Sequence, residues 1–70
     1  MKKEFSAIIK QVDDWWIGWI EEVPGINCQE KTKEALLKSL EITLKEALEF
    51  NRKEAKSNAG PDYFEVNIAV

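Results

Sequence analysis

The six residues 15–20, with the sequence WWIGWI, restrict the fold of this chain more than any other segment. Aromatic and β-branched side chains are enriched in β-strands, so this segment is predicted to be a strand. Side chains alternate across a strand, which gives the segment two faces. One face carries Trp15, Ile17 and Trp19, and the other carries Trp16, Gly18 and Ile20. Both faces are apolar, and we therefore expect this strand to be covered on both sides.

A first strand is predicted just before the tryptophan strand. Residues 4–10 alternate in the way that a strand requires. One face carries Phe5, Ala7 and Ile9, and the other carries Ser6, Ile8 and Lys10. Asp13 and Asp14 then interrupt the run, and aspartates are typical of turns. The short gap predicts a β-hairpin.

A third strand and a long helix are predicted to follow. Beyond a Pro-Gly turn, residues 26–29 are compatible with a short strand. From Lys33 the apolar period changes to 3.6, which predicts a helix that begins after the N-cap Thr32 and ends near Lys56. The expected apolar stripe of this helix consists of Leu36, Leu37, Leu40, Leu44, Ala47, Leu48 and Phe50.

The last segment is predicted to be a fourth strand. Gly60 and Pro61 follow the helix as a stop signal, and residues 63–70 alternate with Phe64, Val66, Ile68 and Val70 on one face. The order is β-β-β-α-β, and a right-handed crossover would bring the last strand beside the first. The prediction is a two-layer α+β fold. Its one long helix covers one face of the sheet and leaves the other face open.

The length of 70 residues fits a single domain, residues 1–70, and such small domains are marginal without extra support. Cys28 is the only cysteine, so no intrachain disulfide forms, and the absence of histidine removes the usual nitrogen ligand of zinc. We expect no metal and no cofactor. Association with further copies, as a dimer or a tetramer, is the support that remains.

Export and membrane insertion are not expected. No run of about 18 apolar residues is present, and Met1-Lys2-Lys3 is not followed by a long apolar run and a cleavage site. A single unpaired thiol without an export signal indicates the cytoplasm.

Catalytic patterns are scarce. Without histidine, Cys28 lacks its usual general base, and a strand residue packed near the core is the simpler interpretation. The pairs Asp13-Asp14 and Glu21-Glu22 are reminiscent of a two-metal site, but adjacent strand residues point to opposite faces. Isolated glycines form no phosphate loop. We do not expect an enzyme.

The tryptophan strand has three possible uses. It could stack single-stranded nucleic acid, but Asp13, Asp14, Glu21 and Glu22 would repel phosphate. A place in the core and in a subunit interface is favoured over stacking on nucleic acid. An acidic rim beside aromatic side chains also suits a basic protein partner. The cluster Arg52, Lys53 and Lys56 is interpreted as complementing the helix dipole.

Two stretches carry a family resemblance: WIGWIEEVPG at residues 16–25 and TKEAL at residues 32–36, which opens a Leu-rich helix. Together they resemble the HicB family of antitoxins. That family has an aromatic strand of the type Tyr-x-Ala-x-Val, then Pro-Asp-Leu-Pro-Gly-Cys, then Gly-Asp-Thr-x-Glu-Glu-Ala before a helix. Here Glu21 stands in place of the first proline, and Ile26 in place of the cysteine.

The resemblance implies a partial ribonuclease-H-like fold and an antitoxin that sequesters a small basic mRNA-cleaving toxin of the HicA type by occlusion. Trp15, Trp19, Glu21 and Glu22 are the expected partner-binding residues, although the sequence leaves open whether the two tryptophans lie under the helix instead. Many family members continue into a DNA-binding domain, and because this chain stops at Val70 we do not expect direct DNA binding. The alternative is a stand-alone structural or regulatory homo-oligomer with no toxin partner.

Overall fold

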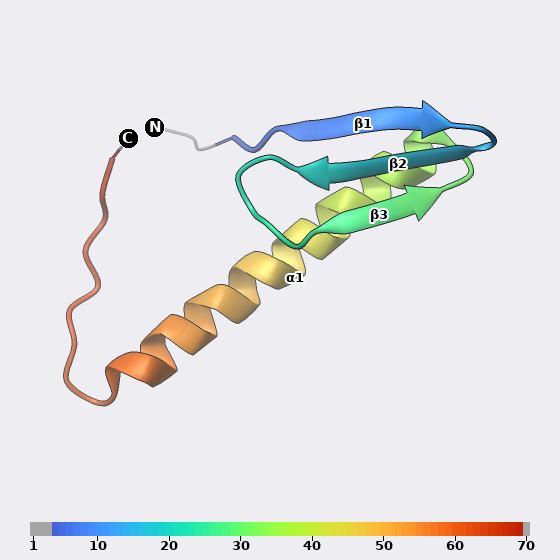
Figure 1. Ribbon diagram of the computed structural model, residues 1–70. Helices are drawn as coiled ribbons and strands as arrows, with labels where there is room; N and C mark the ends of the chain where they lie inside the picture. Colours follow the sequence, from blue (N-terminus) through green and yellow to red (C-terminus); the bar gives the residue numbers. More distant parts are fainter. Residues whose placement is uncertain (1–3, 70) are drawn as a thin grey trace.

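The computed structural model describes residues 4–69, which form a small α+β fold (Figure 1). Three strands, β1 (Ala7–Val12), β2 (Trp15–Ile20) and β3 (Asn27–Glu30), make an antiparallel sheet in the order β1-β2-β3. One long helix, α1 (Lys33–Ala59), follows the sheet. The α+β class and the β-β-β-α part of the predicted order are therefore confirmed.

The hairpin of β1 and β2 closes on a two-residue turn. Val12 pairs with Trp15 and Ile8 pairs with Trp19. Asp13 adopts a positive φ of 55° at the turn, a conformation that aspartate tolerates better than most residues. Because the register with β2 sets its bounds, β1 begins at Ala7 instead of Glu4 and continues to Val12.

The helix begins and ends with the caps that the sequence predicts. The backbone N–H of Ala35 donates to Thr32 Oγ1 at 3.1 Å, which satisfies one of the free amides of the first turn. At the other end Gly60 has a φ of 80° and its N–H donates to the carbonyl oxygen of Ser57 at 3.3 Å. The helix thus runs three residues past the predicted end at Lys56.

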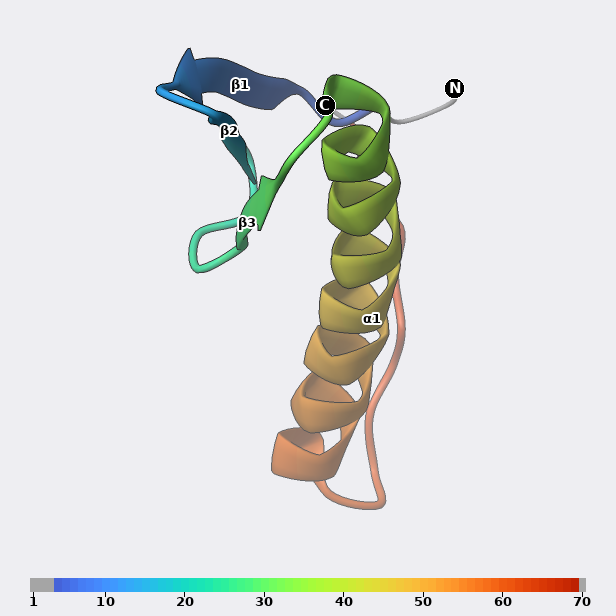
Figure 2. The ribbon, with the colours of Figure 1, turned by 90° about the vertical axis from the view of Figure 1, so that its right-hand side faces the viewer.

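The core lies between α1 and the strands β2 and β3. Figure 2 shows the helix on one side of the sheet, with the opposite face left uncovered. Partly buried Trp16, Ile9 and Leu44 surround the core. Within the described residues, the buried hydrophobic side chains are Ile20, Ile26, Leu36 and Leu40.

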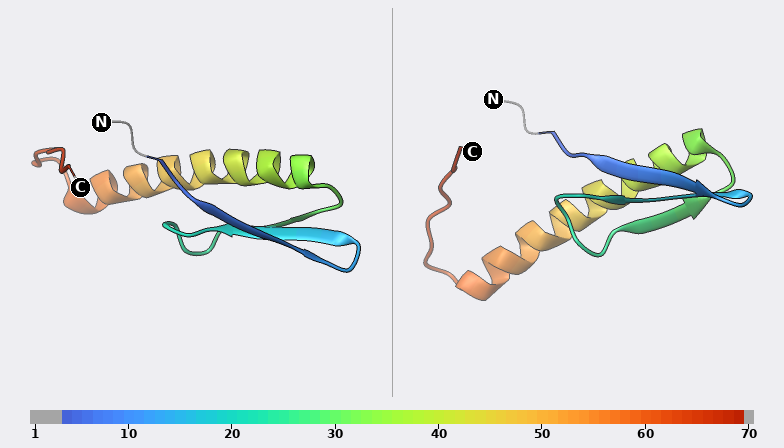
Figure 3. Two further views of the ribbon diagram at one scale, coloured as in Figure 1. Left: turned by 90° about the horizontal axis from the view of Figure 1, so that it is seen from above. Right: turned by 45° about the horizontal axis from the view of Figure 1, so that its top comes forward.

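The predicted apolar stripe of the helix is only partly used. Leu37 is 44% exposed and Phe50 is 63% exposed, so the prediction that they pack on the sheet is wrong. Figure 3 shows that the C-terminal half of α1 extends beyond the end of the sheet, and Phe50 belongs to this half of the helix. Every residue from 49 to 59 is exposed. We call residues 48–59 the helix overhang.

The predicted fourth strand is not formed in the described part of the chain. Residues 63–69 belong to no strand, and Phe64, Val66 and Ile68 are 95%, 75% and 85% exposed. Val70 lies outside the described residues. The physical reason is the length of α1, which carries the chain beyond the sheet instead of back over it. In Figure 1 the segment after the helix, drawn in red, does not run along β1.

The molecule exposes more surface than a compact chain of its mass. Its accessible surface is 6127 Å², whereas a compact monomer of this mass exposes about 4,500 Å². The radius of gyration is 15.3 Å, against about 11 Å for a compact chain of this length. The helix overhang and the segment after it account for this extended shape.

Candidate protein-binding surface

The sheet presents an apolar face on the side opposite to α1, and we call it the outer face. Cross-strand pairing brings its side chains together, because directly paired residues lie on the same face of a sheet. Ile8 pairs with Trp19, Lys10 with Ile17, and Val12 with Trp15. On the β3 side, Ile17 pairs with Gln29 and Trp19 with Asn27. The outer face therefore consists of Ile8, Lys10, Val12, Trp15, Ile17, Trp19, Asn27 and Gln29.

The two tryptophans named from the sequence both lie on the outer face. Trp15 is 38% exposed and Trp19 is 37% exposed, so they do not lie under the helix. Trp16 is on the other face and packs against the core. Ile8 and Val12 are also exposed and flank the tryptophans through the strand register. Neither of these two β1 residues was predicted as a site residue. The alternation of residues 4–10 placed Ile8 on the face opposite to Ile9, whereas Val12 lay outside the predicted strand.

Basic side chains accompany the aromatic residues on this face. Lys31 Nζ lies 4.0 Å from the centroid of the Trp15 ring, which is the geometry of a cation–π contact. Lys10 lies between the Ile8 and Val12 positions of β1. A shallow hollow at the β2–β3 side is lined by Ile17, Gly18, Trp19, Asn27, Cys28 and Gln29. The face thus offers flat apolar area with a few polar groups at its border.

Acidic residues stand at both ends of β2. Asp13 and Asp14 form the turn before Trp15, and Glu21 and Glu22 follow Ile20. Glu22 has a structural task, because its Oε1 accepts a hydrogen bond of 2.8 Å from the backbone N–H of Ser6. The backbone N–H of Glu21 donates to the Ser6 carbonyl oxygen at 2.9 Å. Of the two glutamates, Glu21 is therefore the better placed to meet a partner through its side chain.

Cys28 lies on the helix side of β3 and is partly buried. Its Sγ is 3.7 Å from Thr43 Oγ1 on α1, a weak hydrogen-bond contact. The prediction of a strand residue packed near the core is confirmed. Among residues 4–69, no cluster of three or more acidic, cysteine or histidine side chains could hold a metal ion. No helix in this part of the chain is long and apolar enough to span a membrane.

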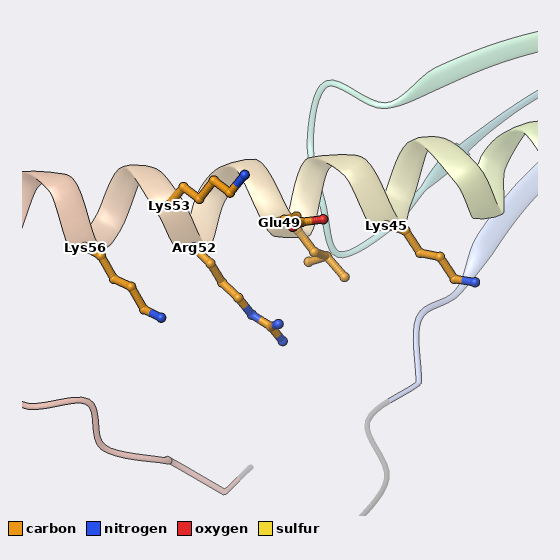
Figure 4. Close-up of a pocket in the computed structure, with 6 residues that line it drawn as sticks. Lys45, Glu49, Arg52, Lys53 and Lys56 are labelled. Atoms are coloured by element: carbon orange, nitrogen blue, oxygen red, sulfur yellow. The ribbon is translucent and has the colours of Figure 1, made fainter.

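The helix α1 carries a second surface feature, a basic groove that begins at Lys45 and continues along the helix overhang (Figure 4). Two of its cations are already paired: Lys45 lies 3.6 Å from Glu41, and Lys56 lies 3.4 Å from Glu65. Both pairs are exposed and contribute little to stability. Lys56 is in the last turn, where it suits the helix dipole as predicted. The lining residues are Lys45, Leu48, Glu49, Arg52, Lys53 and Lys56.

The three-stranded antiparallel sheet, its single long helix and the exposed aromatic outer face define a small α+β protein with a candidate protein-binding surface. Comparison with models of known protein families, with curated proteins and with solved structures found no match to this chain. The functional argument therefore depends on the sequence pattern and on the geometry of this surface.

Proposed function

We propose that the protein is an antitoxin-like binding module that sequesters a small basic mRNA-cleaving toxin of the HicA type by occlusion. The observation that carries the proposal is the exposed aromatic strip of the outer face, bordered by acidic turns at both ends of β2. The HicB-like sequence pattern of residues 16–25 and 32–36 supports the same choice. The module acts by binding alone and has no catalytic step.

The aromatic side chains supply the anchors. A tryptophan that is already held by its neighbours loses little freedom when a partner covers it, and it contributes a large apolar area. Trp15 and Trp19 are held in this way by cross-strand pairs with Val12 and Ile8. A partner that covers the outer face would bury all four side chains together.

The acidic rim supplies orientation and speed of encounter. A toxin that binds mRNA presents positive charge at its RNA site, because phosphate contacts dominate such binding. Asp13, Asp14 and Glu21 outnumber Lys10 and Lys31 at this face, so they would attract the same positive surface and direct it toward the aromatic strip. The net charge of −3 acts in the same direction. A toxin bound in this way has its RNA site covered and cannot bind mRNA, and this is the occlusion that we propose.

The proposal carries two further expectations. The antiparallel β1-β2-β3 order followed by α1 suits a partial ribonuclease-H-like sheet. A similar fold does not imply nuclease activity. The site of action is the cytoplasm, where mRNA cleavage takes place.

Co-purification tests the proposal. The chain is co-expressed with a small basic toxin of the HicA type, and the complex is isolated at low salt. Trp19→Ala combined with Glu21→Lys should abolish co-purification. Ile42→Ala, which removes a 49% exposed side chain from α1, is the control and should leave it intact. Failure of the unmodified chain to co-purify would contradict the toxin assignment.

A second function, a stand-alone regulatory homo-oligomer, is favoured by the small core and the large exposed surface. The two functions separate in one measurement. If the protein is a toxin-binding module, its sedimenting mass changes when the basic protein is added, because the oligomer either dissociates in part or binds the added protein. A stand-alone oligomer keeps its mass in sedimentation and leaves RNA cleavage by that protein unchanged.

A further inference from the structure

The segment after the helix has the pattern of a strand but no strand partner in the described chain. Its residues 63–69 read YFEVNIA, with Phe64, Val66 and Ile68 on one face of an extended chain. These three side chains are 95%, 75% and 85% exposed. Side chains of this type favour a half-buried sheet position. The segment therefore has apolar surface that its own fold does not cover.

The sheet has a matching open edge. Within residues 4–69, β1 pairs with β2 on one side only, so its six residues leave a row of backbone groups available on the other side. The strand at the opposite edge, β3, has only four residues and is in contact with α1. The helix packs on β2 and β3, which leaves the helix side of β1 less covered. The edge of β1 is therefore the better template for an added strand.

The helix overhang prevents the segment from pairing with β1 of its own chain. Ala47 is the most C-terminal residue of α1 among those that pack against the core. From there to Gly60 the helix rises about 20 Å, at about 1.5 Å per residue. An extended chain needs about six residues to return over that distance, at about 3.3 Å per residue. Phe64 and Val66 would be used in the return and could not lie beside β1.

The apolar and polar faces of residues 63–69 also match the two faces of β1. If Phe64, Val66 and Ile68 join the helix side of the sheet, they extend the apolar layer that begins at Ile9. Glu65 and Asn67 then lie on the outer face, which is the face that carries Lys10. Opposite charges on neighbouring strands are favourable, and the match holds for either strand direction. In the described chain Glu65 has only an exposed ion pair with Lys56.

We propose that residues 63–69 of one copy add as a fourth strand to the β1 edge of a second copy, and that the exchange is reciprocal in a two-fold dimer. A second copy is the occupant because each chain offers one such segment and one such edge, as a closed symmetric dimer requires. The surplus surface of roughly 1,600 Å² per chain exceeds the area of about 800 Å² that each partner buries in a standard interface.

Disulfide trapping tests which chain the segment meets. In a Cys28→Ser background, Ala7→Cys is combined in turn with Phe64→Cys, Val66→Cys and Ile68→Cys, so that every partner position lies on the helix side of the sheet. Oxidation should give a covalent dimer for at least one combination, visible on a non-reducing gel. A closed monomer of unchanged mass would show pairing within one chain and would overturn the proposal. The toxin plays no part, so the result is independent of the proposed function.

Proline substitution tests whether the contact is a strand. Only alternate residues of an added strand turn their N–H toward the neighbour, so Val66→Pro and Asn67→Pro should differ. One of the two should raise the dimer dissociation constant at least tenfold in analytical ultracentrifugation, and the other should change it less than threefold. Equal behaviour of both variants, or a monomeric unmodified chain at micromolar concentration, would overturn the proposal.

Discussion

Gly18 of β2 lies directly beneath Leu40 of α1, and a Cβ added to this glycine would be 3.2 Å from Leu40 Cδ1. The same Cβ would be 2.9 Å from Ile9 Cγ2 and 3.0 Å from the carbonyl oxygen of Ile8. Two of these neighbours are core side chains and the third is backbone of the paired strand. The glycine therefore sets how closely the helix approaches the sheet.

Gly18→Ala should consequently destabilise the fold although alanine suits a strand better than glycine does. Overpacking of a core costs about 1–3 kcal/mol, and the relief of glycine entropy returns about 0.5–1 kcal/mol. We expect a net loss of about 1–2 kcal/mol in the free energy of unfolding, measured by urea denaturation at a fixed protein concentration.

Asparagine separates this steric effect from a backbone effect. Gly25 has a φ of 90° with nothing within 4 Å of an added Cβ, and asparagine tolerates positive φ. Gly25→Asn should therefore cost only the backbone strain of a positive φ, about 1 kcal/mol, while Gly18→Asn should prevent folding. Equal losses at the two positions would contradict the close helix–sheet contact.

A pair of leucines tests how much of the helix stripe reaches the sheet. Leu40 is 2% exposed and Leu37 is 44% exposed. Leu40→Ala should cost about 2–5 kcal/mol because it leaves a cavity in the core. Leu37→Ala should cost less than about 1 kcal/mol. Both values come from the same denaturation experiment, and similar losses would mean that α1 packs with a different face than described.

The helix cap gives a third prediction. Thr32 Oγ1 accepts the N–H of Ala35 at 3.1 Å, and loss of such a cap costs about 1 kcal/mol. Thr32→Ala should lower the free energy of unfolding by that amount, whereas Thr32→Ser keeps the hydroxyl and should lower it by no more than about 0.3 kcal/mol. A Thr32→Ser variant as unstable as Thr32→Ala would show that the methyl group, and not the hydrogen bond, matters.

Local patterns predicted the elements whose determinants are local. The bounds of β2 follow from its aromatic run, and the turn after Val12 follows from the aspartates. Thr32 and Gly60 mark the helix ends by their own chemistry. In each case the residues that decide the structure are the residues that adopt it.

The wrong predictions have a common cause. Periodicity shows which residues share a face, but it does not show whether another element is close enough to cover that face. Phe50 continues the helical stripe, but the sheet has already ended beneath it. Residues 63–69 alternate as a strand should, but α1 carries them away from β1. For the candidate site, alternation separated Trp15 and Trp19 from Trp16, yet it did not decide which set faces the helix. That choice depends on Gly18, whose missing side chain admits Leu40 on its own face of the sheet.

The tryptophans give the last prediction, because Trp16 and Trp19 of β2 lie on opposite faces of the sheet. Trp16 packs against the core, while Trp19 is 37% exposed on the outer face. Trp16→Ala should cost about 2–3 kcal/mol of unfolding free energy, somewhat less than the loss for a fully buried aromatic residue. Trp19→Ala should cost about 1 kcal/mol and should leave the circular dichroism spectrum unchanged. If Trp19→Ala proved as destabilising as Trp16→Ala, the outer face would already be covered within the fold and could not serve as a binding surface.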